Sequence, residues 1–240
     1  MSVLLSLDGV SKRFRGLVAV DQVSFAVPQG AIFAVIGPNG AGKTTLFNMI
    51  AGAMPPDAGT IVFAGEPVQG LSADAVCRRG IARTFQIVRP FPALSVEDNV
   101  IVGALLHRRD VAAARALAHQ LLTQLDLFDK RERIASTLTL PDRKRLEVAR
   151  ALATGPRLLL LDEVMAGLRP TETDRMVAIL RALNRGGLTI LLIEHVMRAV
   201  MALASRVLVL DHGVAIAEGA PEQVVRDPAV VQSYLGAEEV

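Results

Sequence analysis

The sequence predicts an α/β fold built on a parallel β-sheet that is buried on both faces. Three segments, 31–36, 158–161 and 188–193, are nearly continuous apolar runs of strand length, and expected helices separate them along the chain. Such runs are typical of parallel strands, because helices cover both faces of a parallel sheet. Hydrophobic residues make up 51% of the chain and aromatic residues only 4%. These proportions favour aliphatic strands over a β-sandwich.

Length, charge and cysteine content exclude several classes of protein. A chain of 240 residues can bury a substantial core, and its formal net charge of +2 is too small for a dedicated nucleic-acid binder. The single cysteine, Cys77, allows no intrachain disulfide, which fits a reducing compartment. No apolar run approaches the roughly 20 residues of a membrane helix, and the N-terminus lacks the form of a signal peptide. We therefore expect a cytoplasmic chain without nucleic-acid partners, whose membrane role would need partner chains.

The first expected elements are two strands. Residues 4–8 and 18–27 alternate between apolar and polar side chains, and a turn at 28–30 closes the second strand. Phe14 lies between the two strands. Its ring would either stack on an adenine or pack as an ordinary apolar residue, and the sequence leaves these alternatives open.

A glycine-rich turn follows the apolar strand at 31–36 and precedes an expected helix at 45–50. Its spacing fits the phosphate-binding P-loop G-x-x-x-x-G-K-[ST]. Glycines let backbone N–H groups turn towards a polyphosphate, and the helix start adds the positive end of its dipole. A turn that binds nothing is the alternative, but the strand and helix lie where the motif requires them. The expected nucleotide-binding residues are Gly37, Pro38, Asn39, Gly40, Ala41, Gly42, Lys43, Thr44 and Thr45, with Lys43 on the β- and γ-phosphates and Thr44 also at Mg²⁺.

The remaining elements continue the α/β pattern around a helical insert. A turn at 55–59 precedes a strand at 60–64, and another short strand is expected at 81–86. From 95 onwards the pattern is mostly helical and begins with the capping-box-like Ser95-Val96-Glu97-Asp98. Two strands at 207–211 and 214–218 indicate a hairpin. We therefore expect one domain over 1–240, with an α/β core at 1–94 and 155–240 and a helical subdomain at 95–154.

Polar residues end three of the expected strands. Asp162 and Glu163 follow four leucines, so we expect Asp162 near Mg²⁺ and Glu163 beside the water that attacks the γ-phosphate. Two exposed charges at a strand end, the alternative, fit that apolar run poorly. His195 ends another strand and would either reach the same phosphates or be structural. Gln86 ends a third strand, where its amide could touch the metal or the water.

Together these positions resemble those of an ABC-type ATPase, and the resemblance covers essentially the whole chain. It implies a P-loop NTPase fold with an antiparallel β subdomain and an inserted helical subdomain, binding ATP and Mg²⁺. It also implies that Phe14 stacks on adenine, that Gln86 and Asp162 serve the metal, and that Gln86, Glu163 and His195 act in catalysis. Segments similar to the ATPase subunits of branched-chain amino-acid importers lie at 83–86, 145–154, 192–197 and 217–236.

The signature loop of that family, usually Leu-Ser-Gly-Gly-Gln, corresponds to residues 138–142, which here are Leu-Thr-Leu-Pro-Asp. Leu140 and Pro141 replace both glycines, and proline has no N–H to offer a phosphate. Pro141 is expected to be the first residue of the next helix, whereas Asp142 is expected to turn a negative charge towards an anion. In the family, ATP lies between two domains, so the altered loop should weaken the site that it completes. Each lost phosphate contact costs about 1.5–3 kcal/mol.

The resemblance implies an ATP-hydrolysing subunit that energises an ABC importer for branched-chain or related amino acids. The implied partners are a second ATPase subunit in a heterodimer, transmembrane permease subunits and, indirectly, a substrate-binding protein. The chain would then lie on the inner face of the cell membrane. An ATP-binding regulatory subunit with weak hydrolysis is an alternative that the altered loop favours and that Glu163 and His195 disfavour. The short helical insert disfavours a third possibility, a soluble ABC ATPase of DNA repair or translation.

Overall fold

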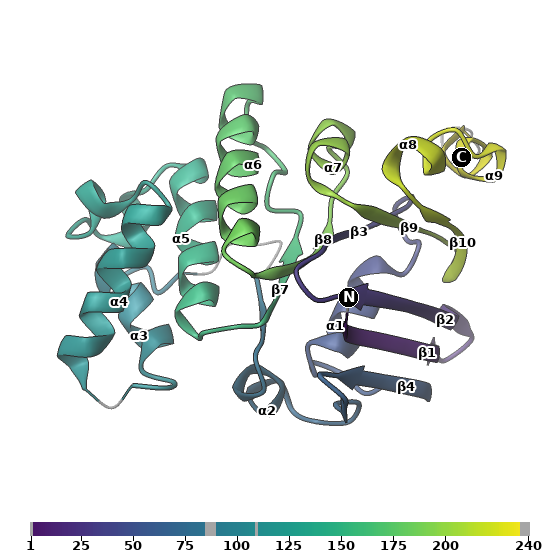
Figure 1. Ribbon diagram of the computed structural model, residues 1–240, viewed down its shortest axis with the longest axis horizontal. Helices are drawn as coiled ribbons and strands as arrows, with labels where there is room; N and C mark the ends of the chain where they lie inside the picture. Colours follow the sequence, from purple (N-terminus) through teal and green to yellow (C-terminus); the bar gives the residue numbers. More distant parts are fainter. Residues whose placement is uncertain (1, 85–89, 109, 236–240) are drawn as a thin grey trace.

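A computed structural model describes residues 2–84, 90–108 and 110–235. The strands form two sheets, a four-stranded sheet ordered β2-β1-β4-β5 and a six-stranded sheet ordered β10-β9-β3-β8-β7-β6. Helix α1 lies between the sheets, and further helices cover the opposite face of the larger one (Figure 1). The described chain therefore stacks an antiparallel sheet, a helix, a mainly parallel sheet and an outer helical layer.

The six-stranded sheet has the parallel core that the apolar runs predict. Its first five strands along the chain are mutually parallel, and only the last, β10, runs antiparallel to its neighbour β9. Every residue of β3, β7 and β8 is buried, because helices or the second sheet cover both faces. The strands are β3 (Ile32–Ile36), β6 (Ile81–Arg83), β7 (Leu158–Asp162), β8 (Thr189–Ile193), β9 (Arg206–Asp211) and β10 (Val214–Gly219).

The antiparallel sheet is longer than the sequence predicts. Its strands are β1 (Val3–Phe14), β2 (Leu17–Pro28), β4 (Ala58–Phe63) and β5 (Glu66–Pro67). The alternation of apolar and polar residues fails around Gly9 and Gln22, which both have positive φ, and the register between β1 and β2 shifts there. The irregularity at Gly9 hides the full length of β1, whereas β2 extends the predicted 18–27 by only one residue at each end. Phe14 is therefore the last residue of β1 and pairs with Leu17 across a tight turn, instead of lying in a linker.

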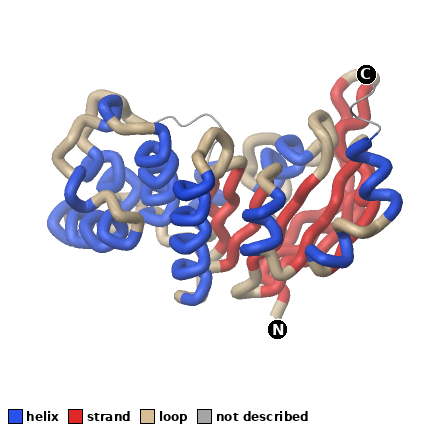
Figure 2. Tube along the Cα trace, turned by 90° about the horizontal axis from the view of Figure 1, so that it is seen from above, coloured by secondary structure: helices blue, strands red, loops and turns tan. Residues whose placement is uncertain are grey.

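The helices differ in what they cover. Helix α1 fills the space between the two sheets, whereas α5, α6 and α7 pack on the far face of the six-stranded sheet. Figure 2 shows the helices from α3 to α5 gathered at one end of the molecule, away from the antiparallel sheet. The α-helices are α1 (Lys43–Ile50), α2 (Ala73–Arg78), α3 (Val96–Ala104), α4 (Val111–Gln124), α5 (Leu140–Ala153), α6 (Pro170–Arg185), α7 (Met197–Leu203), α8 (Pro221–Val224) and α9 (Pro228–Leu235).

Local capping explains several helix starts. The Ser95 hydroxyl accepts a hydrogen bond from the Asp98 N–H at 3.0 Å, as the capping pattern predicts. Helix α5 begins at Leu140, so Pro141 is its second residue, one later than expected, and Thr139 is its N-cap. Proline is tolerated there because first-turn N–H groups have no partner within the helix. Across the described ranges, no helix is long and apolar enough to span a bilayer.

Candidate nucleotide-hydrolysing site

The predicted P-loop connects the end of β3 to the start of α1 with a tightly packed backbone. Gly37 and Gly42 have φ values of +149° and +99°, which residues with a Cβ rarely adopt. A Cβ at Gly37 would lie 2.0 Å from the Leu210 carbonyl oxygen, and one at Gly42 would lie 2.2 Å from that of Ala19. These two positions need glycine because neighbouring strands approach the loop backbone closely.

Lys43 is buried inside the loop that it is expected to serve. Its ammonium donates to the carbonyl oxygens of Gly37 and Pro38, each at 2.8 Å. Burial lowers its pKa, and the nearby carboxylates of Glu163 and Asp162 oppose that shift. The loop therefore folds around the ammonium of the lysine that the motif assigns to phosphate. Thr44 is exposed and Thr45 is half-buried, and both line the adjoining cavity.

A cavity of about 420 Å³ joins the P-loop to Phe14. Its lining includes Phe14 and Val18 from the β1–β2 hairpin, loop residues from Asn39 to Thr45, Glu163, and His212 from the β9–β10 turn. The Phe14 side chain is 43% exposed, and the Lys12 ammonium lies 5.8 Å from its ring centre. An exposed ring at the rim of the cavity beside the P-loop favours a stacking role for Phe14 over an ordinary packing role.

Asp162 ends β7 inside the core, and only one of its carboxylate oxygens is paired. Oδ2 accepts a hydrogen bond from Arg83 Nη2 at 2.8 Å, while the buried Oδ1 has no hydrogen-bond partner among the described residues. Buried polar atoms nearly always have a hydrogen-bond partner or a ligand, so this oxygen is a candidate ligand atom for a metal ion. Mg²⁺ prefers oxygen ligands and usually takes one or two from the protein. The Asp162 carboxylate and the Thr44 hydroxyl therefore fit the predicted magnesium ion.

Glu163, which lines the cavity bordered by Phe14, contacts His195. Their side chains come from the ends of the neighbouring parallel strands β7 and β8, and Glu163 Oε1 lies 2.5 Å from His195 Nε2. The Glu163 side chain is 11% exposed and that of His195 is 41% exposed. This arrangement brings together a carboxylate and an imidazole that the sequence predicted separately. Gln86, the remaining predicted site residue, lies outside the described residues.

Sequence reasoning missed three charged residues around this site. Arg83 pairs with Asp162, Lys144 donates to the Glu163 carbonyl oxygen at 2.9 Å, and Glu194 accepts from the Met165 N–H at 2.9 Å. Burial raises the pKa of Glu194 to about 7, and the positive charge of Lys144 opposes that shift. The one direct sequence signal concerned Glu194, which immediately precedes the predicted His195 after an apolar strand. The contacts themselves join distant parts of the chain.

The C-terminal helix also reaches the P-loop. Burial raises the pKa of Tyr234 on α9, and the nearby Gly37 N–H opposes that shift. Ala229, Gln232 and Ser233 of the same helix line a cavity of about 670 Å³ beside the loop, and this cavity shares residues 39–41 and His212 with the one bordered by Phe14. The tail, whose only sequence signal was a family resemblance, thus lies beside the P-loop of the candidate site.

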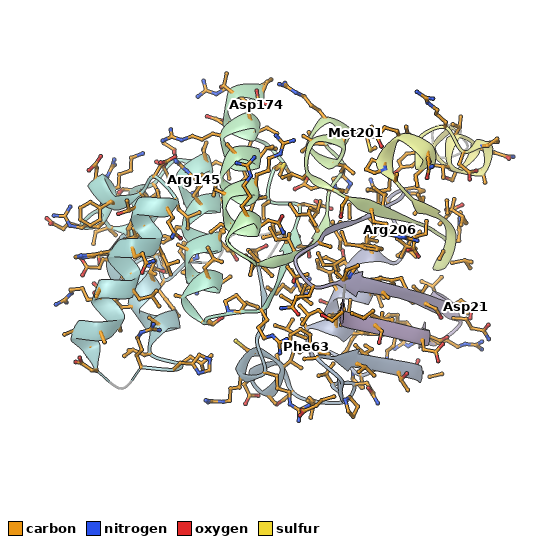
Figure 3. All side chains as sticks on the ribbon, in the orientation of Figure 1. Asp21, Phe63, Arg145, Asp174, Met201 and Arg206 are labelled. Atoms are coloured by element: carbon orange, nitrogen blue, oxygen red, sulfur yellow. The ribbon has the colours of Figure 1, made fainter. Side chains whose placement is uncertain are left out.

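The altered signature loop corrects one expectation about charge. Asp142 does not turn its charge outwards towards an anion, since its side chain is only 3% exposed. Its carboxylate accepts hydrogen bonds from Lys130 Nζ at 2.5 Å, from the Thr139 hydroxyl at 2.9 Å and from Arg145 Nη2 at 2.5 Å. Arg145 is labelled in Figure 3 on the helical side of the molecule. The pairing of Asp142 with two cations at the start of α5 explains why its charge turns inwards.

Comparisons with known proteins agree with this geometry. The sequence profile described as "ABC transporter" matches residues 20–166, and that of "Branched-chain amino acid ATP-binding cassette transporter" matches residues 216–240. The chain is 38% identical to BraF, a high-affinity branched-chain amino acid transport ATP-binding protein of Pseudomonas aeruginosa, over 97% of this chain and 98% of that protein. This chain belongs to the ABC transporter ATP-binding proteins, in their branched-chain amino acid family.

Two further relatives support the same family. LivG of Escherichia coli, a high-affinity branched-chain amino acid transport ATP-binding protein, is 40% identical over 97% of this chain and 98% of its own length. The solved ADP conformation of the ATP-binding cassette MJ1267 superposes with a TM-score of 0.90 at 29% identity, covering 98% of this chain and 100% of that one. The ABC ATPase fold, with its antiparallel and parallel sheets, is therefore confirmed. The chain is an ABC-type ATPase subunit that acts with the other components of a transporter.

Proposed function

We propose that this chain binds ATP with Mg²⁺ and hydrolyses it to drive an importer of branched-chain or related amino acids. The observation that carries the proposal is the contact of Glu163 with His195, 2.5 Å apart, at the cavity that Lys43 and Phe14 also border. Relatives near 40% identity are named for branched-chain amino acid transport, which supports the substrate class.

The proposed mechanism rests on positioning and on neutralising charge. Phe14 stacks on the adenine, while Lys43 and the loop N–H groups hold the phosphates. Mg²⁺, held by Thr44 and Asp162 with Gln86 nearby, would neutralise charge on the β- and γ-phosphates. The Glu163 carboxylate orients and polarises the attacking water. His195, beside that carboxylate, contacts the γ-phosphate.

We further propose that the chain works in an asymmetric heterodimer. Its own P-loop site keeps the residues expected for hydrolysis. That site should therefore work if a partner ATPase subunit supplies an intact signature loop. The site completed by residues 138–142 is weakened, because Pro141 has no N–H and the Thr139 hydroxyl already donates to Asp142 at 2.9 Å. Equal hydrolysis rates at the two sites of the purified complex would contradict this asymmetry.

The proposed docking site for the remaining partners lies where the helices of residues 95–154 meet the core. Residues 95–154 form a helical subdomain in this proposal, and a cavity of about 300 Å³ lies between its helices and the core. Its lining includes Arg83 and Phe91, which flank the segment containing Gln86. A permease subunit would dock there and hold this chain at the cytoplasmic face of the cell membrane. A substrate-binding protein would act through that permease.

The test uses the complex purified through a tag on this chain and reconstituted in vesicles. We expect ATP-dependent uptake of leucine, isoleucine or valine, and we expect Glu163→Gln to abolish uptake while ATP stays bound. Glu132→Gln is the matched control, because it removes an exposed carboxylate whose one ion pair among the described residues is with the adjacent Arg131. Uptake that persists in Glu163→Gln, or a complex that moves none of these amino acids, would refute the proposal.

A second candidate function is a regulatory subunit that binds ATP but barely hydrolyses it. The observation that favours it is the altered signature loop, which has few hydrogen-bond donors for a phosphate. Pro141 has no N–H, and the Asp142 side chain is a buried carboxylate. The same Glu163→Gln variant separates the two functions. A hydrolytic subunit loses the activity of the complex, whereas a regulatory subunit leaves it nearly unchanged.

A further inference from the structure

The backbone at Glu163 adopts a conformation that residues other than glycine rarely adopt. Its φ is +50°, in the left-handed region where a Cβ crowds the backbone. Such strain persists only where surrounding contacts hold it. The direction of the Glu163 carboxylate depends on this backbone, because the side chain leaves from the same Cα. The contacts that hold residues 163–165 therefore decide where the carboxylate points.

Among the described residues, three hydrogen bonds tie the backbone of this segment to other elements, and two of them come from side chains. The Glu163 N–H donates to the Ile193 carbonyl oxygen at 2.9 Å, continuing the ladder between β7 and β8. The Glu163 carbonyl oxygen accepts from Lys144 Nζ at 2.9 Å. The Met165 N–H donates to Glu194 Oε1, also at 2.9 Å. Lys144 comes from α5 and Glu194 follows β8, so the segment is held from two separate elements.

Both side chains are deeply buried, with Lys144 5% exposed and Glu194 1% exposed. Removing an ammonium and a carboxylate from water is unfavourable, and apolar residues of similar volume would pack the same space more readily. Neither residue belongs to the nucleotide cavity bordered by Phe14 and the P-loop. What each one does contact is a peptide group of the segment that begins at Glu163.

We propose that Lys144 and Glu194 are positioning residues that hold the Glu163 backbone in its left-handed conformation and so aim its carboxylate at the attacking water. This inference rests on the proposed role of Glu163 in hydrolysis. It adds two residues that act through Glu163 without touching the nucleotide. An error of about 1 Å in the placement of a catalytic group lowers a rate by as much as a hundredfold.

Two disruptive variants and two conservative ones test the proposal. Lys144→Met removes the donor but keeps the volume, and the Glu163 carbonyl oxygen still accepts from the Ala166 N–H at 3.2 Å. Glu194→Leu removes the acceptor for Met165. Lys144→Arg keeps a donor, and Glu194→Gln keeps an oxygen acceptor. Each variant is measured in the complex purified through a tag on this chain, by kcat and KM for ATP and by the affinity for a fluorescent ATP analogue.

A control variant separates positioning from general destabilisation. Asn184 donates to the carbonyl oxygens of Gly30 and Leu188 at 2.9 and 2.8 Å, far along the chain from Glu163. Asn184→Ala therefore removes hydrogen bonds of the same kind without touching the catalytic segment. We expect it to lower the melting temperature while kcat stays within about twofold of the wild type.

We expect Lys144→Met and Glu194→Leu each to lower kcat tenfold to about a hundredfold, with KM and analogue affinity within about twofold of the wild type. Lys144→Arg and Glu194→Gln should restore most of kcat. If both disruptive variants keep kcat within twofold, the positioning role is refuted, and if one of them fails to assemble, the kcat of the other decides. Glu163→Gln in the same assay separates the proposals, since full activity there would refute the catalytic role of Glu163 itself.

Discussion

The buried carboxyl of Glu194 predicts a specific pH dependence of stability. Burial raises its pKa from 4.5 to about 7, and the groups that face it are the Lys144 ammonium, the Glu163 carboxylate and the Met165 N–H. A carboxyl with a raised pKa binds its proton more tightly in the folded state than in the unfolded state. Its contribution to stability is therefore complete below about pH 4.5 and is lost as the pH rises towards 7.

The magnitude follows from the size of the shift. A rise of about 2.5 units corresponds to roughly 3 kcal/mol between the two limits, at 1.36 kcal/mol per unit. About 2 kcal/mol of this should be lost between roughly pH 5.5 and pH 8. Glu194→Gln carries no titrating proton, so the free energy of unfolding of the wild type should fall relative to this variant by that amount over the same range.

Urea unfolding of the full chain at a series of pH values measures this difference directly. The variant keeps an oxygen that can accept from the Met165 N–H, so its fold should be retained. Subtracting its pH profile from that of the wild type cancels the other titrating groups that the two proteins share. Parallel profiles, differing by less than about 0.5 kcal/mol between the two ends, would refute the assignment of a protonated, buried Glu194.

Three further substitutions test the site. Phe14→Ala should weaken ATP binding about tenfold, because base stacking on an aromatic ring is worth roughly 1–3 kcal/mol; equilibrium binding of ATP measures it, and unchanged affinity would return Phe14 to a packing role. Lys43→Met should abolish tight ATP binding in the same assay, and EDTA should stop hydrolysis by the wild type without unfolding it. Asp142→Ala should lower the free energy of unfolding by about 3 kcal/mol, because it leaves the buried charge of Arg145 without this partner. Urea unfolding that matched the wild type would show that these ion pairs contribute little.

Much of the fold could be predicted from local patterns. The apolar runs that became β3, β7 and β8 are uninterrupted, and the spacing from Gly37 to Thr44 specifies both a turn and its neighbours. Strand β1 was underestimated because positive φ at Gly9 breaks the alternation of side chains, whereas the predicted strand at 18–27 is nearly the whole of β2. A pattern detects an element only while its period lasts, so irregular strands appear shorter than they are.

The sequence alone determined the chemical groups of the candidate site and the strands that end in them. Only the tertiary structure decided which groups meet. It pairs Asp162 with Arg83 and Glu163 with His195, and it turns the Asp142 carboxylate away from solvent into the start of α5. The reason is physical: period and propensity act within a few residues, whereas these contacts join segments brought together when the sheet and its helices pack.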